Sequence, residues 1–273
     1  MNTLKDAKRI VVKVGTSTLT YDTGKANIRR MAKLAQVLSD LANSGREILF
    51  VTSGALGVGV GKLGLPERPT DTPSRQAAAT VGQCELMFMY DKLFGEYGRI
   101  VGQLLITKDD TQDEERRRNL MNTLQQMLAF GVLPIINEND SVTVEEIENV
   151  IGDNDQLSAI VARLVQADAL VLLTDTDGLF SADPHLDPEA QIIPIVKSLT
   201  PEIMALAGKP GSKRGTGGTA TKLKAAQIAT QAGIDTVIMN GANPEDLYKL
   251  FDGRQIGTHF IAMQQSANSA ALL

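Results

Sequence analysis

The sequence predicts an α/β fold in which helices cover both faces of a mainly parallel, open sheet. Three short apolar segments of strand character, residues 8–14, 47–52 and 132–136, alternate with helical patterns. Strand, helix and strand at this spacing form a βαβ unit, and such crossovers build parallel sheets. Each of these strands ends in small, polar or glycine residues, which is typical of a ligand-binding edge. We therefore expect one αβα sandwich with two lobes.

The other elements follow from the same periodicities. Residues 27–44 read as an amphipathic helix that ends before Gly45. Glycines at 59–64 match G-x-G-x-x-G, but they do not directly follow a strand, so we interpret them as a packing surface and not as a dinucleotide site. Residues 66–73 form a turn-rich loop, and 109–118 a solvated face. Further strands are predicted at 100–107, 169–173 and 236–239, and further helices at 76–97, 116–130, from 155 onward, 200–206 and 219–232.

Composition excludes several classes of protein. The net charge of −5 indicates neither a nucleic-acid surface nor a membrane surface. We find no apolar run long enough to span a membrane and no signal-peptide core. The single cysteine, Cys84, fits a reducing cytoplasm and is expected to be a small core residue. The two histidines form no zinc-ligand pattern, so the chemistry does not depend on imidazole.

Two polar clusters predict a site. Residues 152–155, Gly-Asp-Asn-Asp, lead directly into a helix, where unpaired N–H groups and the dipole favour anions. A plain N-cap explains one such side chain, but three are present, which favours a site over a cap. Residues 137–140, Asn-Glu-Asn-Asp, directly follow the strand at 132–136. We expect the two clusters to meet at one sheet edge.

Two lysines indicate that the site handles phosphate. Lys13 lies inside an apolar strand beside Gly15, and it either snorkels from an edge or points out of the strand end toward an anion. Residues 215–222 begin a helix and end in Lys222. They lack the glycine that a Walker A motif places before its lysine, so they form either an anion cradle or a surface loop. A carboxylate acceptor is already ionised at pH 7, and its phosphorylation needs cations more than a general base.

These motifs resemble the amino acid kinase family, and within it the branch that phosphorylates L-glutamate. The resemblance runs in order and with compatible spacing from about residue 8 to 262. It rests on Val-Lys-Val-Gly-Thr-Ser (12–17), Val-Thr-Ser-Gly-Ala (51–55), Ile-Asn-Glu-Asn-Asp (136–140), Gly-Asp-Asn-Asp (152–155), Leu-Thr-Asp (173–175) and Gly-Thr-Gly-Gly through Lys222 (215–222). It implies ATP-dependent, Mg²⁺-assisted transfer of phosphate to the γ-carboxylate of L-glutamate. The product would be L-glutamyl 5-phosphate, the first intermediate of proline synthesis.

The resemblance also implies roles for individual residues. Lys13 and Lys222 would act on the transferring phosphate, and Asp155 would orient both lysines. The residues implied to hold glutamate are Ser53, Gly54, Ala55, Asp140 and Asn154. The residues implied to bind nucleotide are Lys13, Gly15, Thr16, Thr174, Asp175, Thr216, Gly217, Gly218, Thr219, Ala220, Thr221 and Lys222. The metal ligands stay unassigned.

Domain organisation and partners follow from the same resemblance. We expect a kinase domain over 1–263, with an N-terminal substrate lobe and a C-terminal nucleotide lobe, and a disordered tail at 264–273. No C-terminal PUA domain is expected. The resemblance implies a cytoplasmic homo-oligomer, dimer or tetramer, with proline as feedback inhibitor and coupling to glutamyl phosphate reductase.

Two other interpretations stay open at this point. A related kinase of the same fold could act on acetylglutamate, aspartate, carbamate or UMP, and it would differ in the acceptor pocket. A non-catalytic module could sense proline or glutamate, but it would have no need for Lys13, Asp155 and Lys222.

Overall fold

A single mixed sheet organises the chain. The computed structural model describes all residues except 1–3, 22–24, 143–153, 185, 207–216 and 264–273. The strand order is β3-β4-β2-β1-β5-β7-β8-β6. The strands are β1 Arg9–Val14, β2 Glu47–Val51, β3 Val101–Ile106, β4 Leu133–Glu138, β5 Ala169–Thr174, β6 Ile195–Val196, β7 Asp235–Asn240 and β8 Thr258–Phe260. The predicted tail at 264–273 and the predicted nucleotide contact Thr216 lie outside the described residues.

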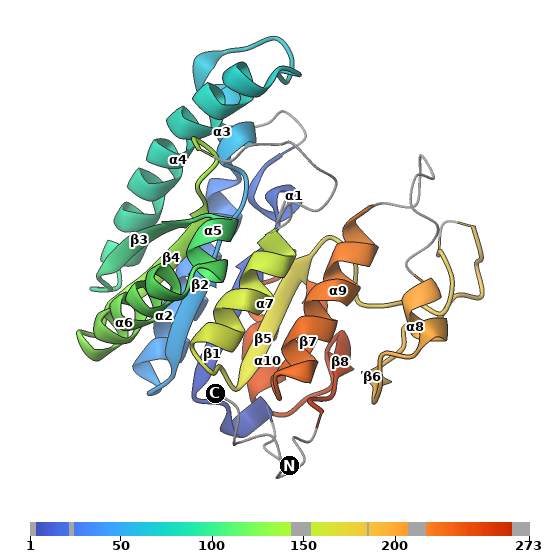
Figure 1. Cartoon of the computed structure of the whole chain (residues 1–273). Helices are drawn as coiled ribbons and strands as arrows, with labels where there is room; N and C mark the ends of the chain where they lie inside the picture. Colours follow the sequence, from blue (N-terminus) through green and yellow to red (C-terminus); the bar gives the residue numbers. More distant parts are fainter. Residues whose placement is uncertain (1–3, 22–24, 143–153, 185, 207–216, 264–273) are drawn as a thin grey trace.

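Strand pairing confirms the predicted α/β class. All pairs from β3 through β7 are parallel, β7 pairs with β8 antiparallel, and β8 pairs with β6 in parallel. The parallel strands therefore end at one edge of the sheet, the upper edge in Figure 1. The sequence did not predict β6 and β8, because strands of two and three residues are too short to show a period.

Helices cover both faces of the sheet (Figure 1). The helices are η1 Leu4–Asp6 (3-10), α1 Thr16–Leu19, α2 Ile28–Asn43, α3 Ala55–Leu63, α4 Thr72–Gly95, α5 Lys108–Gln112, α6 Glu114–Ala129, α7 Asn154–Leu164, α8 Pro201–Ala205, α9 Gly217–Gln231 and α10 Asp246–Phe251. One core lies between α2, α4, α10 and the sheet, and includes Val12 and Phe50. The other lies under α6, α7 and α9, and includes Val11 and Leu49. Neighbouring strand residues thus serve opposite cores, as strand geometry requires.

The glycine-rich segment 59–64 forms part of α3 and packs closely on α4. A Cβ atom at Gly59 would lie 1.8 Å from the carbonyl oxygen of Ala78. A Cβ atom at Gly82 would lie 1.8 Å from the carbonyl oxygen of Ala55. Only glycine allows the two backbones to approach so closely. The interpretation as a packing surface is therefore confirmed for Gly59, whereas Gly61 and Gly64 are exposed at the end of the helix.

Cys84 is not a core residue, and that expectation was wrong. The side chain is exposed. The buried positions of α4 near it are Ala79, Gly82, Gln83 and Leu86, which form one stripe at helical spacing. Cys84 lies off this stripe, so the helix turns it away from the core.

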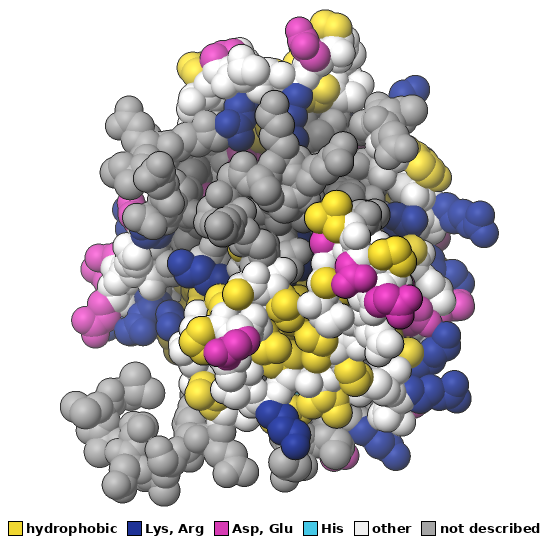
Figure 2. Space-filling view, turned by 90° about the vertical axis from the view of Figure 1, so that its right-hand side faces the viewer, with side chains coloured by type: hydrophobic (Ala, Val, Ile, Leu, Met, Phe, Trp, Pro, Cys, Tyr) yellow, Lys and Arg dark blue, Asp and Glu magenta, His cyan; other side chains and the backbone are white. Residues whose placement is uncertain are grey.

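The edge of the sheet at β6 is short. Figure 2 shows the side of the molecule that lies at the right in Figure 1, where hydrophobic side chains gather. Ile195 of β6 is 48% exposed. Because β6 has two residues, this edge offers little backbone for another strand to pair with.

Candidate active site

Lys13 is a buried residue of a central strand. It stands in β1 between Val51 of β2 and Leu172 of β5, and it is 5% exposed. Its strand neighbours Val12 and Val14 face the core under α2 and α4, so Lys13 faces α7. A lysine in this position cannot snorkel from an edge, and only the second of the two interpretations agrees with the structure. A buried ammonium group of this kind requires a partner.

Asp155 is that partner, and it also reaches the second lysine. It lies in the first turn of α7 and is 1% exposed. One carboxylate oxygen forms an ion pair with Lys13, and the other lies 3.7 Å from Nζ of Lys222 and accepts a hydrogen bond from Thr221 Oγ1 at 3.2 Å. Two ammonium groups and one carboxylate leave a net positive charge. This cluster is therefore suited to binding an anion.

The start of α9 holds Lys222 beside the cluster. Nζ of Lys222 donates to the carbonyl oxygen of Gly218 at 2.9 Å, and Thr221 Oγ1 lies 3.1 Å from the same oxygen, which competes with Asp155 for its one hydrogen. The helix begins at Gly217, Thr219 is half-buried and Ala220 is exposed. Residues 217–222 thus occupy the first turns of a helix whose N-terminus favours anions.

Two glycine turns touch each other at the same edge. Gly15 follows β1, and its N–H donates to the carbonyl oxygen of Leu173 in β5. Gly54 follows β2 with a φ of +96°, a conformation that side-chain-bearing residues rarely adopt. A Cβ atom at Gly54 would lie 3.5 Å from Cγ2 of Thr16. The turn predicted to bind phosphate and the turn predicted to bind glutamate, which continues into buried Ala55 of α3, are therefore in contact.

Asn154 ties the ends of β2 and β4 together. Its side-chain nitrogen lies 2.6 Å from the carbonyl oxygen of Thr52, 2.9 Å from Oγ of Ser53 and 2.7 Å from Oδ1 of Asn137. Asn137 is 2% exposed and donates in turn to Oε1 of Gln83 at 2.7 Å. The sequence assigned roles to Ser53 and Asn154 but none to Asn137 or Gln83. The signal for Asn137 was present, since an asparagine ends a buried strand, whereas Gln83 sits in α4 with no local signal.

Asp140 opens onto a cavity. The cavity has a volume of about 320 Å³ and is also lined by Gln83, Cys84, Glu138 and Asn139. Its lining joins the end of β4 to α4. The cavity is large enough for a small metabolite and lies next to the Asn137–Asn154 contact, so it adjoins the sheet edge that carries the lysines.

Thr174 and Asp175 end β5 on the other side of β1. Thr174 is 4% exposed, and its hydroxyl donates to a carboxylate oxygen of Asp175 at 2.9 Å. The carbonyl oxygen of Thr174 accepts from N–H of Gly241, just after β7. These predicted nucleotide contacts follow β5, the strand that pairs with the strand of Lys13.

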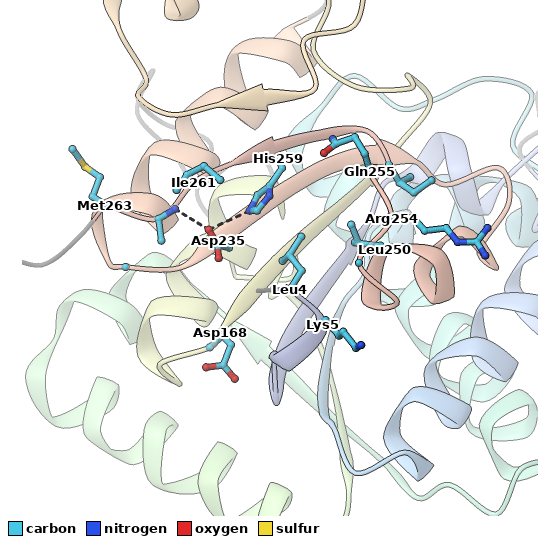
Figure 3. A pocket seen from close by; sticks show the side chains of 15 residues that line it. Leu4, Lys5, Asp168, Asp235, Leu250, Arg254, Gln255, His259, Ile261 and Met263 are labelled. Atoms are coloured by element: carbon cyan, nitrogen blue, oxygen red, sulfur yellow. Dashed lines mark hydrogen bonds and ion pairs between the residues drawn. The ribbon is translucent and has the colours of Figure 1, made fainter. Parts of the chain in front are cut away.

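A larger cavity, of about 590 Å³, lies at the opposite end of the sheet (Figure 3). It is lined by residues before the strands, among them Asp168 and Asp235, and by His259. Asp235 there binds His259 at 3.2 Å and N–H of Ala262 at 2.9 Å. No residue that the sequence assigned to the site lines this cavity. We therefore place the candidate active site at the carboxyl edge.

The described part of the chain was also searched for metal-ligand clusters and for membrane-spanning helices. It has no group of three or more histidine, cysteine, aspartate or glutamate side chains arranged to hold a metal ion. Among the same residues, no helix has both the length and the apolar character needed to cross a membrane.

Comparisons with known proteins agree with this arrangement. The sequence is 51% identical over 261 residues to glutamate 5-kinase of Clostridium perfringens, covering 95% of this chain and 97% of that protein. It is 53% identical over 264 residues to glutamate 5-kinase of Listeria monocytogenes, covering 96% of each.

Solved structures share the fold at low identity. Isopentenyl phosphate kinase of T. acidophilum superposes with a TM-score of 0.63 at 18% identity, covering 93% of this chain and 100% of that chain. UMP kinase of Bacillus anthracis gives 0.62 at 15% identity, covering 94% and 96%. The profile described as "Amino acid kinase family" matches residues 8–240. This match and the identity above half to full-length relatives show that the chain belongs to the amino acid kinase family.

Proposed function

We propose that this chain transfers the γ-phosphate of ATP to the γ-carboxylate of L-glutamate, which yields L-glutamyl 5-phosphate and ADP as the first step of proline synthesis. The observation that carries the proposal is the buried Lys13–Asp155–Lys222 cluster. It lies beside a polar acceptor site formed by the ends of β2 and β4. The relatives with about half of their residues identical are named glutamate 5-kinase, which supports this acceptor.

The cluster suits phosphoryl transfer to a carboxylate. A γ-carboxylate oxygen attacks the γ-phosphorus, and the bond from that phosphorus to the oxygen bridging to ADP breaks. The acceptor is ionised at pH 7, so no base has to remove a proton. The main obstacle is repulsion between two anions, and Lys13 and Lys222 reduce it. Asp155 holds both ammonium groups at a fixed separation.

Nucleotide and metal complete the proposed site. We assign the nucleotide to Gly15, Thr16, Thr174, Asp175 and the start of α9 at 216–222, of which Thr216 lies outside the described residues. Mg²⁺ commonly binds through phosphates and keeps several waters, so it would neutralise charge on the nucleotide. Asp155 is engaged by two lysines, which leaves it poorly suited to be a metal ligand.

The acceptor half is proposed to comprise Ser53, Gly54, Ala55, Asp140 and Asn154. Asp140 carries a negative charge at the mouth of the 320 Å³ cavity and can receive the α-ammonium group of glutamate. The proposal divides 1–263 into an N-terminal lobe for glutamate and a C-terminal lobe for nucleotide. Residues from both halves of the sequence meet at Asp155, which supports such a division.

We include an oligomer and regulation in the proposal. We propose a homodimer or homotetramer in which a partner subunit covers exposed apolar side chains such as Phe88, Ile100 and Phe130, which are 66%, 67% and 71% exposed. Light scattering on the purified protein tests this point. Proline inhibition, coupling to glutamyl phosphate reductase and a cytoplasmic location follow from the same pathway assignment. Titration with proline under subsaturating glutamate tests the first of these.

The deciding experiment traps the acyl phosphate. Purified protein with ATP, Mg²⁺, glutamate and hydroxylamine should form the hydroxamate, and excess EDTA should abolish its formation. Aspartate, acetylglutamate, carbamate and UMP in place of glutamate test the related kinases. Release of ADP with one of these substrates and none with glutamate would reject the acceptor assignment. Absence of ATP turnover with every substrate would favour a sensing module.

A further inference from the structure

Two polar side chains of α4 face the acceptor edge of the sheet. Gln83 and Tyr90 are seven residues apart, which places them on the same side of the helix. Gln83 is 8% exposed and Tyr90 is 1% exposed. Gln83 Oε1 accepts a hydrogen bond from Asn137 at 2.7 Å, and the hydroxyl of Tyr90 lies 2.7 Å from that of Thr52. Because buried polar groups need partners, these contacts fix where β2 and β4 end relative to α4.

Both contacts lead to Asn154. The side-chain nitrogen of Asn154 approaches the carbonyl oxygen of Thr52 and Oδ1 of Asn137, at 2.6 and 2.7 Å. An amide nitrogen has two hydrogens, and Ser53 Oγ at 2.9 Å is a third acceptor. The nitrogen is thus fully engaged by protein. The side-chain oxygen of Asn154, Oδ1, is therefore the atom of this amide that can face a ligand.

The direction of this network is set by one backbone group. The carbonyl oxygen of Thr52 can only accept, so Asn154 must turn its nitrogen toward it. Asn137 must then present Oδ1 to Asn154, and its own nitrogen must point at Gln83. Gln83 accepts with Oε1, and its Nε2 is buried with no hydrogen-bond partner in the described part of the chain. A buried donor left over in this way carries a cost that packing alone does not explain.

We propose that Gln83 and Tyr90 are positioning residues of the acceptor site, and that they act through Asn137 and Thr52 on the side chain of Asn154. This inference rests on the proposed function, because it assigns the orientation of Asn154 to glutamate binding. Gln83 also lines the cavity that contains Asp140, which places it beside the proposed acceptor site.

The test compares glutamate KM, ATP KM and melting temperature in four variants. Gln83→Leu removes the acceptor for Asn137 at similar volume, and Tyr90→Phe removes one hydroxyl. Each should raise glutamate KM about tenfold, the scale of one lost hydrogen bond, with ATP KM within about twofold. Gln83→Glu keeps an oxygen acceptor and should recover most of the affinity. Leu86→Ala, a fully buried position of the same helix, is the control for loss of packing.

The control separates positioning from stability. Leu86→Ala should lower the melting temperature at unchanged glutamate KM. If Leu86→Ala raises glutamate KM as much as Gln83→Leu does, the effect is structural and the proposal is wrong. It is also wrong if Gln83→Leu and Tyr90→Phe both leave glutamate KM within about twofold. Tyr90→Phe is the milder change and keeps the test usable if Gln83→Leu does not fold.

A double-mutant cycle tests the route through Asn154. In an Asn154→Ala background, Gln83→Leu should change the glutamate dissociation constant by less than about twofold, because its target is gone. If instead Gln83→Leu raises the glutamate dissociation constant by the same factor with and without Asn154, Gln83 does not act through Asn154. The wild-type protein keeps the two proposals distinct. If wild type forms no hydroxamate, the kinase assignment is rejected. If wild type turns over normally and the variants keep the wild-type glutamate KM, only the positioning role is rejected.

Discussion

Replacing Asp155 with asparagine tests the lysine cluster most directly. The substitution keeps the shape of the side chain and removes one negative charge from a position that is 1% exposed. Lys13, whose side chain is 7% exposed, then loses its ion-pair partner, and Lys222, 3.7 Å away, loses its counter-charge. Both lysines remain, so the change isolates their alignment from their presence.

The expected magnitude follows from this geometry. At about 4 Å, with an effective dielectric constant of about 20, one unit charge pair is worth roughly 4 kcal/mol. Breaking a buried pair by removing one partner costs about 3–5 kcal/mol, which for a chain of this size lowers the melting temperature on the order of 10 °C. Loss of preorganised alignment should reduce kcat by about 10²–10³. Glutamate should bind nearly as well as before, since the proposal assigns glutamate to Asn154 and Asp140 and assigns Asp155 to the two lysines.

Two assays check these values. Hydroxamate formation gives kcat and glutamate KM, and thermal unfolding with and without ATP gives the stability change. ATP should reduce the difference in melting temperature between mutant and wild type, because its phosphates replace the negative charge of Asp155 beside the two lysines. Asp252→Asn, at an exposed aspartate of the chain, is the matched control and should change nothing. A kcat within threefold of wild type, or a gap that ATP leaves unchanged, would refute the reasoning.

Three further predictions follow. Asp140→Ala should raise glutamate KM at least tenfold and leave ATP KM nearly unchanged, because the non-reacting end of glutamate is recognised in ground and transition states alike; an effect on kcat alone would contradict this. Lys222→Ala should lower kcat by about 10²–10³ with little change in glutamate KM, and near-normal turnover would leave this lysine a structural role only. Gly59→Ala should destabilise the protein by about 1–3 kcal/mol or more in denaturant unfolding, since its Cβ would lie 1.8 Å from the carbonyl oxygen of Ala78. Gly57→Ala is its control: the nearest atom would be 3.6 Å away, so equal destabilisation of the two variants would reject the helix-contact explanation.

The sequence predicted the fold wherever elements were long enough to show a period. The strands predicted at 8–14, 132–136 and 169–173 appear as β1, β4 and β5, with ends that shift by one or two residues. Segments with too few residues for a period, β6 and β8, were missed. The cysteine was misplaced for a related reason, because an uninterrupted helical pattern does not reveal which side of the helix Cys84 occupies.

The lysine cluster was predictable because charge in an apolar segment is costly. Lys13 in a strand and Asp155 at a helix start are each unusual locally, and each therefore indicates a partner elsewhere. The structure brings these two together with Lys222, as the sequence predicted. Their catalytic roles stay predictions until the variants are measured.

The amide network was not predictable, because its information lies in how strands pair. Val51 of β2 stands opposite Ile136 of β4, and N–H of Thr52 donates to the carbonyl oxygen of Ile136. This register brings the next residues, Thr52 and Asn137, to the same point of the edge, where Asn154 can reach both. A shift of β4 by one residue would turn Asn137 to the other face of the sheet, away from Asn154. The acceptor site thus depends on the β2–β4 register as much as on the polar residues themselves, and the contacts from α4 act on that register.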